Sequence, residues 1–122
     1  MNQLQASPQR TLDHATGAPL AAAPPWRFAL IRAEWHAAIV QRACDSFISE
    51  IARDQNAPHP VDVFDVPGAF EIPLHALQLA RSGRYAAIVA CALVVDGGIY
   101  RHEFVADAVI SGLMRVQLDT QV

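Results

Sequence analysis

A chain of 122 residues is long enough for one ordinary domain and too short for two. Because 52% of its residues are hydrophobic and 17% are charged, the chain can bury a core and is not a disordered polypeptide. The net charge of -3 argues against a protein that binds nucleic acid by electrostatic attraction, so we expect no nucleic-acid partner.

Several protein classes are disfavoured by the residue types present. All nine basic residues are arginine, so no lysine can form a Schiff base, act in a P-loop or anchor pyridoxal phosphate. Cys44 and Cys91 lie in separate apolar segments, which favours reduced core thiols over a disulfide or a zinc site. The longest apolar run, residues 86–95, is shorter than the roughly 20 residues that cross a bilayer, and we recognise no signal sequence. We therefore predict a cytoplasmic protein without a membrane partner, a metal site or a cofactor.

The first 25 residues lack hydrophobic periodicity. They are rich in Gln, Ser, Pro, Thr, Gly and Ala and are predicted to form a flexible arm that could order against a partner subunit, whereas residues 26–122 form the folded domain. Residues 28–31 are predicted as a buried strand and residues 35–53 as a helix. The apolar stripe of this helix is predicted to consist of Ile39, Ala43, Phe47, Ile48 and Ile51.

Strands and helices continue to alternate along the rest of the chain. Residues 54–60 predict a loop and the valine-rich residues 61–66 a second strand. A helix is predicted from Gly68 to Arg81, with Pro73 in its first turns and Gly83 after its end. Residues 86–95 are apolar on both faces, as in a central parallel strand, and residues 96–98 interrupt the pattern. A third helix is predicted at residues 103–119, with an apolar stripe at Val105, Ala108, Val109, Gly112, Leu113 and Val116.

This β-α-β-α-β-α order predicts an α/β fold with a parallel sheet and right-handed crossovers. Parallel sheets of this kind bind ligands beyond the carboxyl ends of their strands. The rule selects three loops, residues 32–36, 67–71 and 96–103, as candidate binding loops. Together they contain a tryptophan, a glutamate, several glycines and a histidine.

The third loop leads directly into a helix and contains Gly97 and Gly98. Free N–H groups at a helix start suit a phosphate or a carboxylate, although a plain tight turn explains two glycines about as well. His102 is a candidate for proton transfer because imidazole titrates near neutral pH; a capping or merely exposed histidine is the alternative. His36 in the first loop is a weaker candidate of the same kind.

The other two loops offer groups suited to a flat, polar ligand. Glu71 lies in the first turn of a predicted helix, where the dipole favours a carboxylate whatever its role, and where it can also accept hydrogen bonds from a polyol. The N–H groups of Ala69 and Phe70 are placed to hold the same ligand. Trp35 follows the first strand and is either a core residue or a stacking surface for a heterocycle.

The segment PGAFEIP at residues 67–73 resembles the signature of the lumazine synthase family, which catalyses the penultimate step of riboflavin biosynthesis. Residues 33–36, 65–73 and 94–104 (VVDGGIYRHEF) are similar to the second type of that family, and the resemblance covers residues 28–122. It implies a transferase with a three-layer, flavodoxin-like subunit, in a homo-oligomer built from pentamers (a single pentamer, a decamer or a larger shell), with active sites between neighbouring subunits.

The resemblance also implies a reaction and a role for each site residue. The substrates 5-amino-6-(D-ribitylamino)uracil and 3,4-dihydroxy-2-butanone 4-phosphate condense to 6,7-dimethyl-8-ribityllumazine, phosphate and water. A substrate amine forms the imine, in keeping with a chain without lysine. His102 is implied to transfer protons and Trp35 to stack on the pyrimidine. The other implied binding residues are Ala69, Phe70 and Glu71 for the ribityl chain, backbone groups of Leu93, Val94 and Val95 for the uracil edge, and Gly98 and Ile99 for the phosphate.

Two features depart from the commoner family pattern. The third loop is one residue longer and lacks the usual Arg-Gly and threonine pair. The chain also stops where the family begins a further core strand, so we expect a truncated family member without the C-terminal arginine that binds phosphate in the neighbouring subunit. The second departure favours, as an alternative function, a non-catalytic module that binds ribityl-pyrimidines or flavin, or that serves assembly. A phospho-acceptor signalling domain of similar topology needs a lysine and is disfavoured.

Overall fold

The computed structural model describes residues 25–54, 58–98 and 101–122 and contains one parallel sheet with the strand order β2-β1-β3. The predicted flexible arm lies outside the described residues, apart from Pro25. The elements, in chain order, are β1 (Phe28–Ala33), α1 (Ala37–Ala52), β2 (Val61–Val66), the short 3-10 helix η2 (Ala69–Glu71), α2 (Ile72–Arg81), β3 (Ala87–Cys91) and α3 (His102–Thr120). The predicted α/β, flavodoxin-like class is therefore confirmed.

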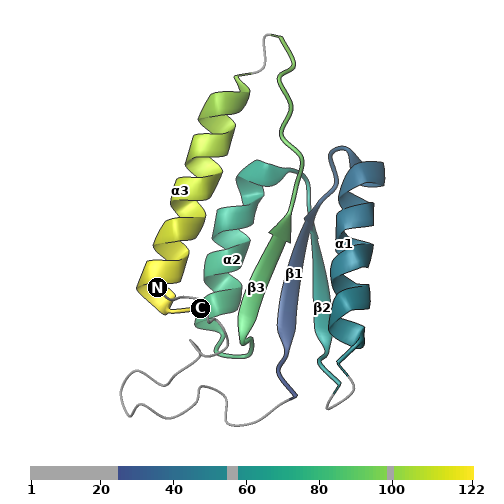
Figure 1. The fold of residues 1–122 in the computed structure, drawn as a ribbon. Helices are drawn as coiled ribbons and strands as arrows, with labels where there is room; N and C mark the ends of the chain where they lie inside the picture. The colour runs from purple at the N-terminus through teal and green to yellow at the C-terminus, as the bar shows by residue number, and fades with distance from the viewer. Residues whose placement is uncertain (1–24, 55–57, 99–100) are drawn as a thin grey trace, which may run out of the picture.

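The molecule has three layers, with α1 on one face of the sheet and α2 and α3 on the other (Figure 1). The side chains of successive residues in the central strand β1 point to opposite faces of the sheet, as in any β-strand. Leu30 is fully buried in the α1-side core with Val40 and Cys44. Its neighbour Ile31 is fully buried in the larger core against α2 and α3.

Helices α2 and α3 pack closely where Gly112 of α3 lies on Pro73 of α2. A Cβ atom at position 112 would lie 2.9 Å from Cβ of Pro73, closer than side chains approach one another. Only a glycine allows this separation without a shift of one helix. The larger core is continuous beneath this contact and consists of Ile31, Ala33, Val66, Ile72, Ala76, Ala80 and Val116.

The structure corrects the predicted stripe of the first helix. Ile39 is 59% exposed and Ala43 is also exposed, whereas Val40 and Cys44 are buried. The buried positions in the first half of the helix therefore lie one residue later than predicted. Periodicity alone does not distinguish the two sets, because residues 39 and 43 and residues 40 and 44 are all apolar. Helix α1 also begins at Ala37, since His36 adopts a left-handed backbone conformation (φ 58°) that ends the preceding loop.

The third strand is shorter than its apolar sequence predicts. Strand β3 pairs only with β1 among the described residues, and the last pair joins Arg32 to Cys91. Strand β1 ends at Ala33, so among the described residues its ladder with β3 does not continue along the apolar residues beyond Cys91. They form an irregular segment that runs past the edge of the sheet before the chain returns as α3 (Figure 1).

The third helix forms nearly as predicted, with one side-chain correction. It runs from His102 to Thr120, and its predicted stripe includes the buried Val109 and Val116. Ala108 was assigned to the same stripe but is exposed. Helix α3 also carries exposed apolar side chains, so its sequence shows no sharp division into an apolar and a polar face. These exposed residues are Phe104, Ile110, Met114 and Leu118.

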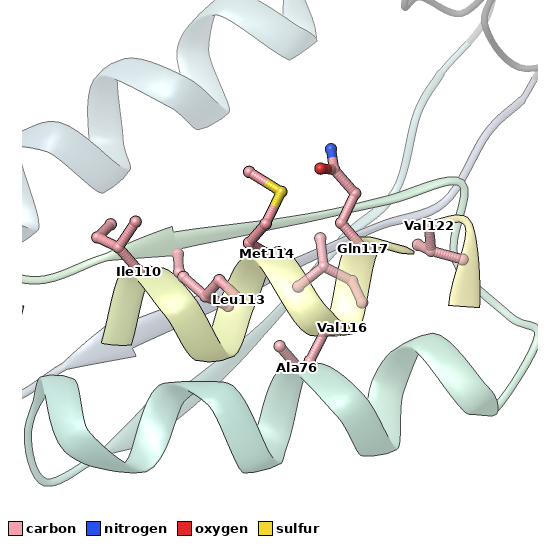
Figure 2. Close-up of a pocket in the computed structure, with 9 residues that line it drawn as sticks. Ala76, Ile110, Leu113, Met114, Val116, Gln117 and Val122 are labelled. Atoms are coloured by element: carbon pink, nitrogen blue, oxygen red, sulfur yellow. The ribbon is translucent and has the colours of Figure 1, made fainter. Parts of the chain in front are cut away.

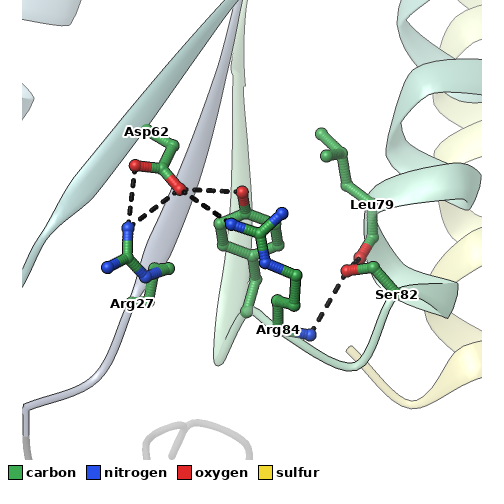
Figure 3. Close-up of polar contacts among 6 residues, drawn as sticks. Arg27, Asp62, Leu79, Ser82 and Arg84 are labelled. Carbon is green, nitrogen blue, oxygen red and sulfur yellow. Dashed lines mark hydrogen bonds and ion pairs between the residues drawn. The ribbon is translucent and has the colours of Figure 1, made fainter.

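One carboxylate joins the amino-terminal ends of all three strands. Asp62 of β2 accepts hydrogen bonds from Nη1 of Arg27 at 2.9 and 3.0 Å and from the hydroxyl of Tyr85 at 2.8 Å, and Arg84 lies 3.9 Å away (Figure 3). The hydrogen bond from Tyr85, supported by Arg27, lowers the pKa of Asp62 below its ordinary value. Nearby, the backbone N–H of Arg84 donates to the hydroxyl of Ser82, which closes the turn after α2.

We expect the folded state to lose stability in acid partly through Asp62. A carboxyl whose pKa is lowered by folding stabilises the protein above about pH 4, and this contribution disappears as the pH falls and the carboxylate is protonated. The variant Asp62→Asn keeps the shape but lacks the charge. In urea unfolding, its deficit relative to the wild type should be largest at pH 7 and should shrink toward pH 3. An Asp107→Asn variant on the exposed surface of α3 is the control; an equal deficit for Asp62→Asn at both pH values would contradict the expectation.

Candidate functional site

The carboxyl edge of the sheet brings the first two candidate loops together. The N–H of Glu34 donates to the carbonyl of Val66 at 2.9 Å, and the N–H of Trp35 donates to the carbonyl of Pro67 at 3.3 Å. These bonds extend the pairing of β1 and β2 beyond the strands and hold the loop of Trp35 beside the PGAFEIP segment. Trp35 itself is 62% exposed, so the structure decides against the core alternative that the sequence left open.

Glu71 has a structural role at the start of the second helical segment. Its Oε1 accepts a hydrogen bond from the N–H of Gly68 at 2.8 Å, which fixes the turn into η2. The carboxylate remains exposed, and the side chain of the adjacent Phe70 is 63% exposed. Ala69 differs from both because it packs against the larger core. The predicted ribityl-binding trio therefore presents two of its three side chains to solvent.

Trp35 lines a small cavity with residues that follow β3. The cavity has a volume of about 280 Å³, and its lining consists of Trp35, His36, Leu93, Val95 and Gly97. Its lining is mainly apolar, as expected for a surface that receives a flat ring. Residues from two of the predicted loops, some 60 positions apart in the sequence, thus meet at one point. His36 was treated as the weaker histidine, yet it contributes to this lining.

A second cavity lies away from all the predicted site residues. It has a volume of about 340 Å³ and opens between α3 and the edge strand β3 (Figure 2). Figure 2 shows Ala76 of α2 at its base, below Leu113 and Val116 of α3. Its lining is largely apolar, with Gln117 as the polar exception.

His102 is the first residue of α3 and follows the third loop. Its side chain is 41% exposed, but the Nδ1 atom is buried and has no hydrogen-bond partner. Nδ1 lies 3.4 Å from Oε1 of Glu103 and 3.5 Å from Oδ1 of Asp96. Two carboxylates, from different sides of the third loop, therefore lie within 4 Å of this nitrogen.

The surroundings of His102 are negatively charged on one side. The pKa of Glu103 is lowered by a hydrogen bond from its own backbone N–H, next by the side chain of Arg101, and also by the charge of His102. Both Nε and Nη2 of Arg101 donate to Oε2 of Glu103, at 3.2 and 3.0 Å. No role was predicted for Asp96 from the sequence. Its place directly after the apolar residues 86–95, and shortly before the candidate His102, was the signal that could have indicated one.

The predicted phosphate turn is described only in part. Gly98 has a φ of 77°, a conformation that favours glycine, so the turn uses this residue for its backbone freedom. Ile99, the other predicted phosphate-binding residue, lies outside the described residues. The assignment of the phosphate to Gly98 and Ile99 therefore stays a prediction.

The sequence of the chain matches a known enzyme family. A family model described as 6,7-dimethyl-8-ribityllumazine synthase matches residues 25–122. The chain belongs to this lumazine synthase family. The resemblance inferred from the PGAFEIP and VVDGGIYRHEF segments is thereby confirmed, and the match covers all but the predicted arm.

Individual lumazine synthases support the same assignment. The 6,7-dimethyl-8-ribityllumazine synthase of Rhodococcus erythropolis is 65% identical over 96 residues, which are 79% of this chain and 62% of that protein. Two proteins named 6,7-dimethyl-8-ribityllumazine synthase 2 are similar. That of Pseudomonas syringae pv. tomato is 58% identical over 81% of this chain and 58% of its own length, and that of Bradyrhizobium diazoefficiens is 59% identical over 82% and 59%. The chain thus spans about three fifths of the length of these curated relatives.

The cysteines of this lumazine synthase family member are core residues. Cys44 and Cys91 are unpaired and both belong to the α1-side core. Burial raises the pKa of Cys44 to about 11, and the hydrogen bond that its thiol donates to Cys91 adds to this shift, so the thiol is protonated at neutral pH. In the described ranges, no cluster of three or more His, Cys, Asp or Glu residues is arranged to hold a metal ion. None of the described helices combines the length and the apolar character needed to span a membrane.

Proposed function

We propose that the protein is a lumazine synthase, a transferase that condenses 5-amino-6-(D-ribitylamino)uracil with 3,4-dihydroxy-2-butanone 4-phosphate. The products are 6,7-dimethyl-8-ribityllumazine, phosphate and water. The observation that carries the proposal is the family match over residues 25–122, with relatives of that name up to 65% identical. The cavity at the carboxyl edge of the sheet supports it, because parallel sheets place their ligand sites there.

The proposed reaction gives each candidate residue a role, and the position of Trp35 beside the cavity supports one of them. The exposed indole of Trp35 stacks on the pyrimidine ring beside the cavity, and backbone groups of residues 93–95 bind the uracil edge. Ala69, Phe70 and Glu71 hold the ribityl chain, and Gly98 and Ile99 receive the phosphate. His102 transfers protons during imine formation and phosphate loss. The attacking nitrogen comes from the substrate, so the protein contributes mainly by positioning two substrates and moving protons.

The decisive experiment mixes the purified 122-residue protein with both substrates and follows the absorbance of the lumazine product. Product formed well above the rate of the uncatalysed mixture is the expected result. The matched control omits the protein, and a second control adds inorganic phosphate as a competitor. Binding of the ribityl-pyrimidine without any product would overturn the proposal and would identify the protein as a binding module.

Glu71→Ala should weaken binding of the ribityl substrate more than binding of the phosphate substrate. The carboxylate is placed to accept hydrogen bonds from hydroxyl groups, whereas the phosphate lies at the third loop. A rise of about tenfold in KM for the ribityl substrate corresponds to one lost charge-assisted hydrogen bond. Because Glu71 also caps η2, Glu71→Gln is the matched variant, since its amide oxygen can still accept from Gly68. Equal changes in both KM values would contradict the assignment.

We further propose that the protein is cytoplasmic and forms a homo-oligomer built from pentamers. Its two unpaired cysteines suit a reducing compartment. Exposed apolar side chains of α3 support assembly, because Phe104, Ile110, Met114 and Leu118 are each at least half exposed and two of them, Ile110 and Met114, border the open groove beside β3. Contiguous exposed apolar side chains are typical of interaction surfaces.

Charged substitutions on α3 should therefore disrupt the assembly. Met114→Glu combined with Leu118→Glu is expected to reduce the mass measured by gel filtration with light scattering, while circular dichroism stays unchanged. Both side chains are already exposed, so the charges do not disturb the core of the subunit. Ser49→Glu on the exposed face of α1 is the control. An unaltered mass for the double variant would show that this face of α3 is not an interface.

A further inference from the structure

The buried Nδ1 atom of His102 constrains where this imidazole carries its proton. Nδ1 faces Oε1 of Glu103 at 3.4 Å and Oδ1 of Asp96 at 3.5 Å. Ionised carboxylates only accept hydrogen bonds, so a lone pair on Nδ1 would point at two negative groups. A proton on Nδ1 replaces this repulsion by attraction. In a neutral imidazole the other nitrogen, Nε2, then carries the free lone pair.

The two carboxylates are not equivalent. Glu103 is already neutralised by Arg101, whose two nitrogens donate to its Oε2. Within the described residues no arginine forms an ion pair with Asp96, whose side chain is 74% exposed. Asp96, Glu103 and Arg101 are the charged groups that the described residues place around the ring, so Asp96 supplies the charge without a cationic counterpart.

We propose that Asp96 is a positioning residue that holds the proton of the neutral His102 ring on Nδ1 and leaves Nε2 to exchange protons with the substrate. The inference deepens the proposed function and rests on it for its catalytic consequence. The present separations are slightly longer than hydrogen bonds. Such contacts commonly tighten when a substrate closes the site. In histidines generally, a hydrogen-bond acceptor beside one ring nitrogen holds the proton there and leaves the other nitrogen to react.

The proton position is directly measurable without substrate. Solid-state ¹⁵N spectra of the 122-residue protein, labelled only at its five histidines, distinguish a protonated Nδ1 from a protonated Nε2 at pH 9, where an ordinary imidazole is neutral. A His102→Asn sample identifies the relevant signals by their loss. We expect wild-type His102 to be protonated on Nδ1 and Asp96→Asn to gain the Nε2-protonated form. Asp119→Asn, about 25 Å along α3, is the matched control and should resemble the wild type.

Kinetics test the catalytic consequence. Asp96→Asn should lose about tenfold in kcat/KM at neutral pH, because a larger share of its neutral rings carries the proton on Nε2 and has no lone pair there to accept one. Asp119→Asn should not show this loss. A wild-type ring protonated on Nε2, or an Asp96→Asn protein with unaltered spectra and unaltered kcat/KM, would overturn the inference. A wild type that makes no lumazine would instead refute the proposed function, and the spectra would still decide the proton position.

Discussion

Replacement of His102 by alanine is expected to lower kcat for lumazine formation about 100- to 10,000-fold, the usual contribution of one general acid–base group. The imidazole starts α3 with its Nδ1 against two carboxylates, so its loss removes the side chain proposed to move protons. The KM values should change much less than kcat, because the proposed substrate contacts are made by other residues. Steady-state kinetics with both substrates measures the two effects separately.

A second histidine variant serves as the control for this prediction. His75→Ala removes an imidazole from α2 whose described hydrogen bond joins Nδ1 to the carbonyl of Glu71 at 3.2 Å. It should retain nearly full kcat. Circular dichroism must show that His102→Ala is folded, because an unfolded variant would reveal a structural role for His102. A folded His102→Ala protein with a kcat within threefold of wild type would remove His102 from the proposed mechanism.

The largest effect on stability is expected for Leu30→Ala. Leu30 lies in the central strand with no exposed surface and packs against Val40 and Cys44 of α1. Truncation of a fully buried leucine removes three carbon atoms and leaves a cavity, which costs about 3–5 kcal/mol. The free energy of unfolding, measured by urea titration, should fall by this amount without a change in the slope of the transition.

Ile39→Ala provides a size-matched comparison for Leu30→Ala. It also removes three carbon atoms, but Ile39 is 59% exposed on α1, so the expected loss is below about 1 kcal/mol. The pair also tests the corrected stripe of α1, since the sequence assigned Ile39 to the core. Equal losses for the two variants would restore the original assignment.

The fold was accessible from the sequence because strong local signals agreed with one another. The valine-rich strand at residues 61–66 and the helix that ends before Gly83 were predicted within a few residues of their observed bounds. The predicted length of strand β3 was too great. An apolar run shows where a strand can form, whereas the length of the strand depends on its partner strand. That partner, β1, ends at Ala33. Side-chain packing of α1 was likewise decided by tertiary contacts that periodicity alone does not contain.

The candidate site was accessible only as a set of loops. The rule for parallel sheets selected the regions of Trp35, Glu71 and His102, and the signature segment named the family. It did not reveal that the Glu71 carboxylate caps η2, nor that Asp96 lies beside the His102 ring. Both facts depend on side-chain geometry across a turn, which neither composition nor spacing encodes.

The Asp62 network lies at the amino-terminal ends of the strands, whereas the candidate loops follow their carboxyl ends. Arg27, Asp62 and Tyr85 connect the beginnings of all three strands by hydrogen bonds. A substitution in a candidate loop therefore leaves these bonds in place, and activity and stability should be separable by mutation in this subunit.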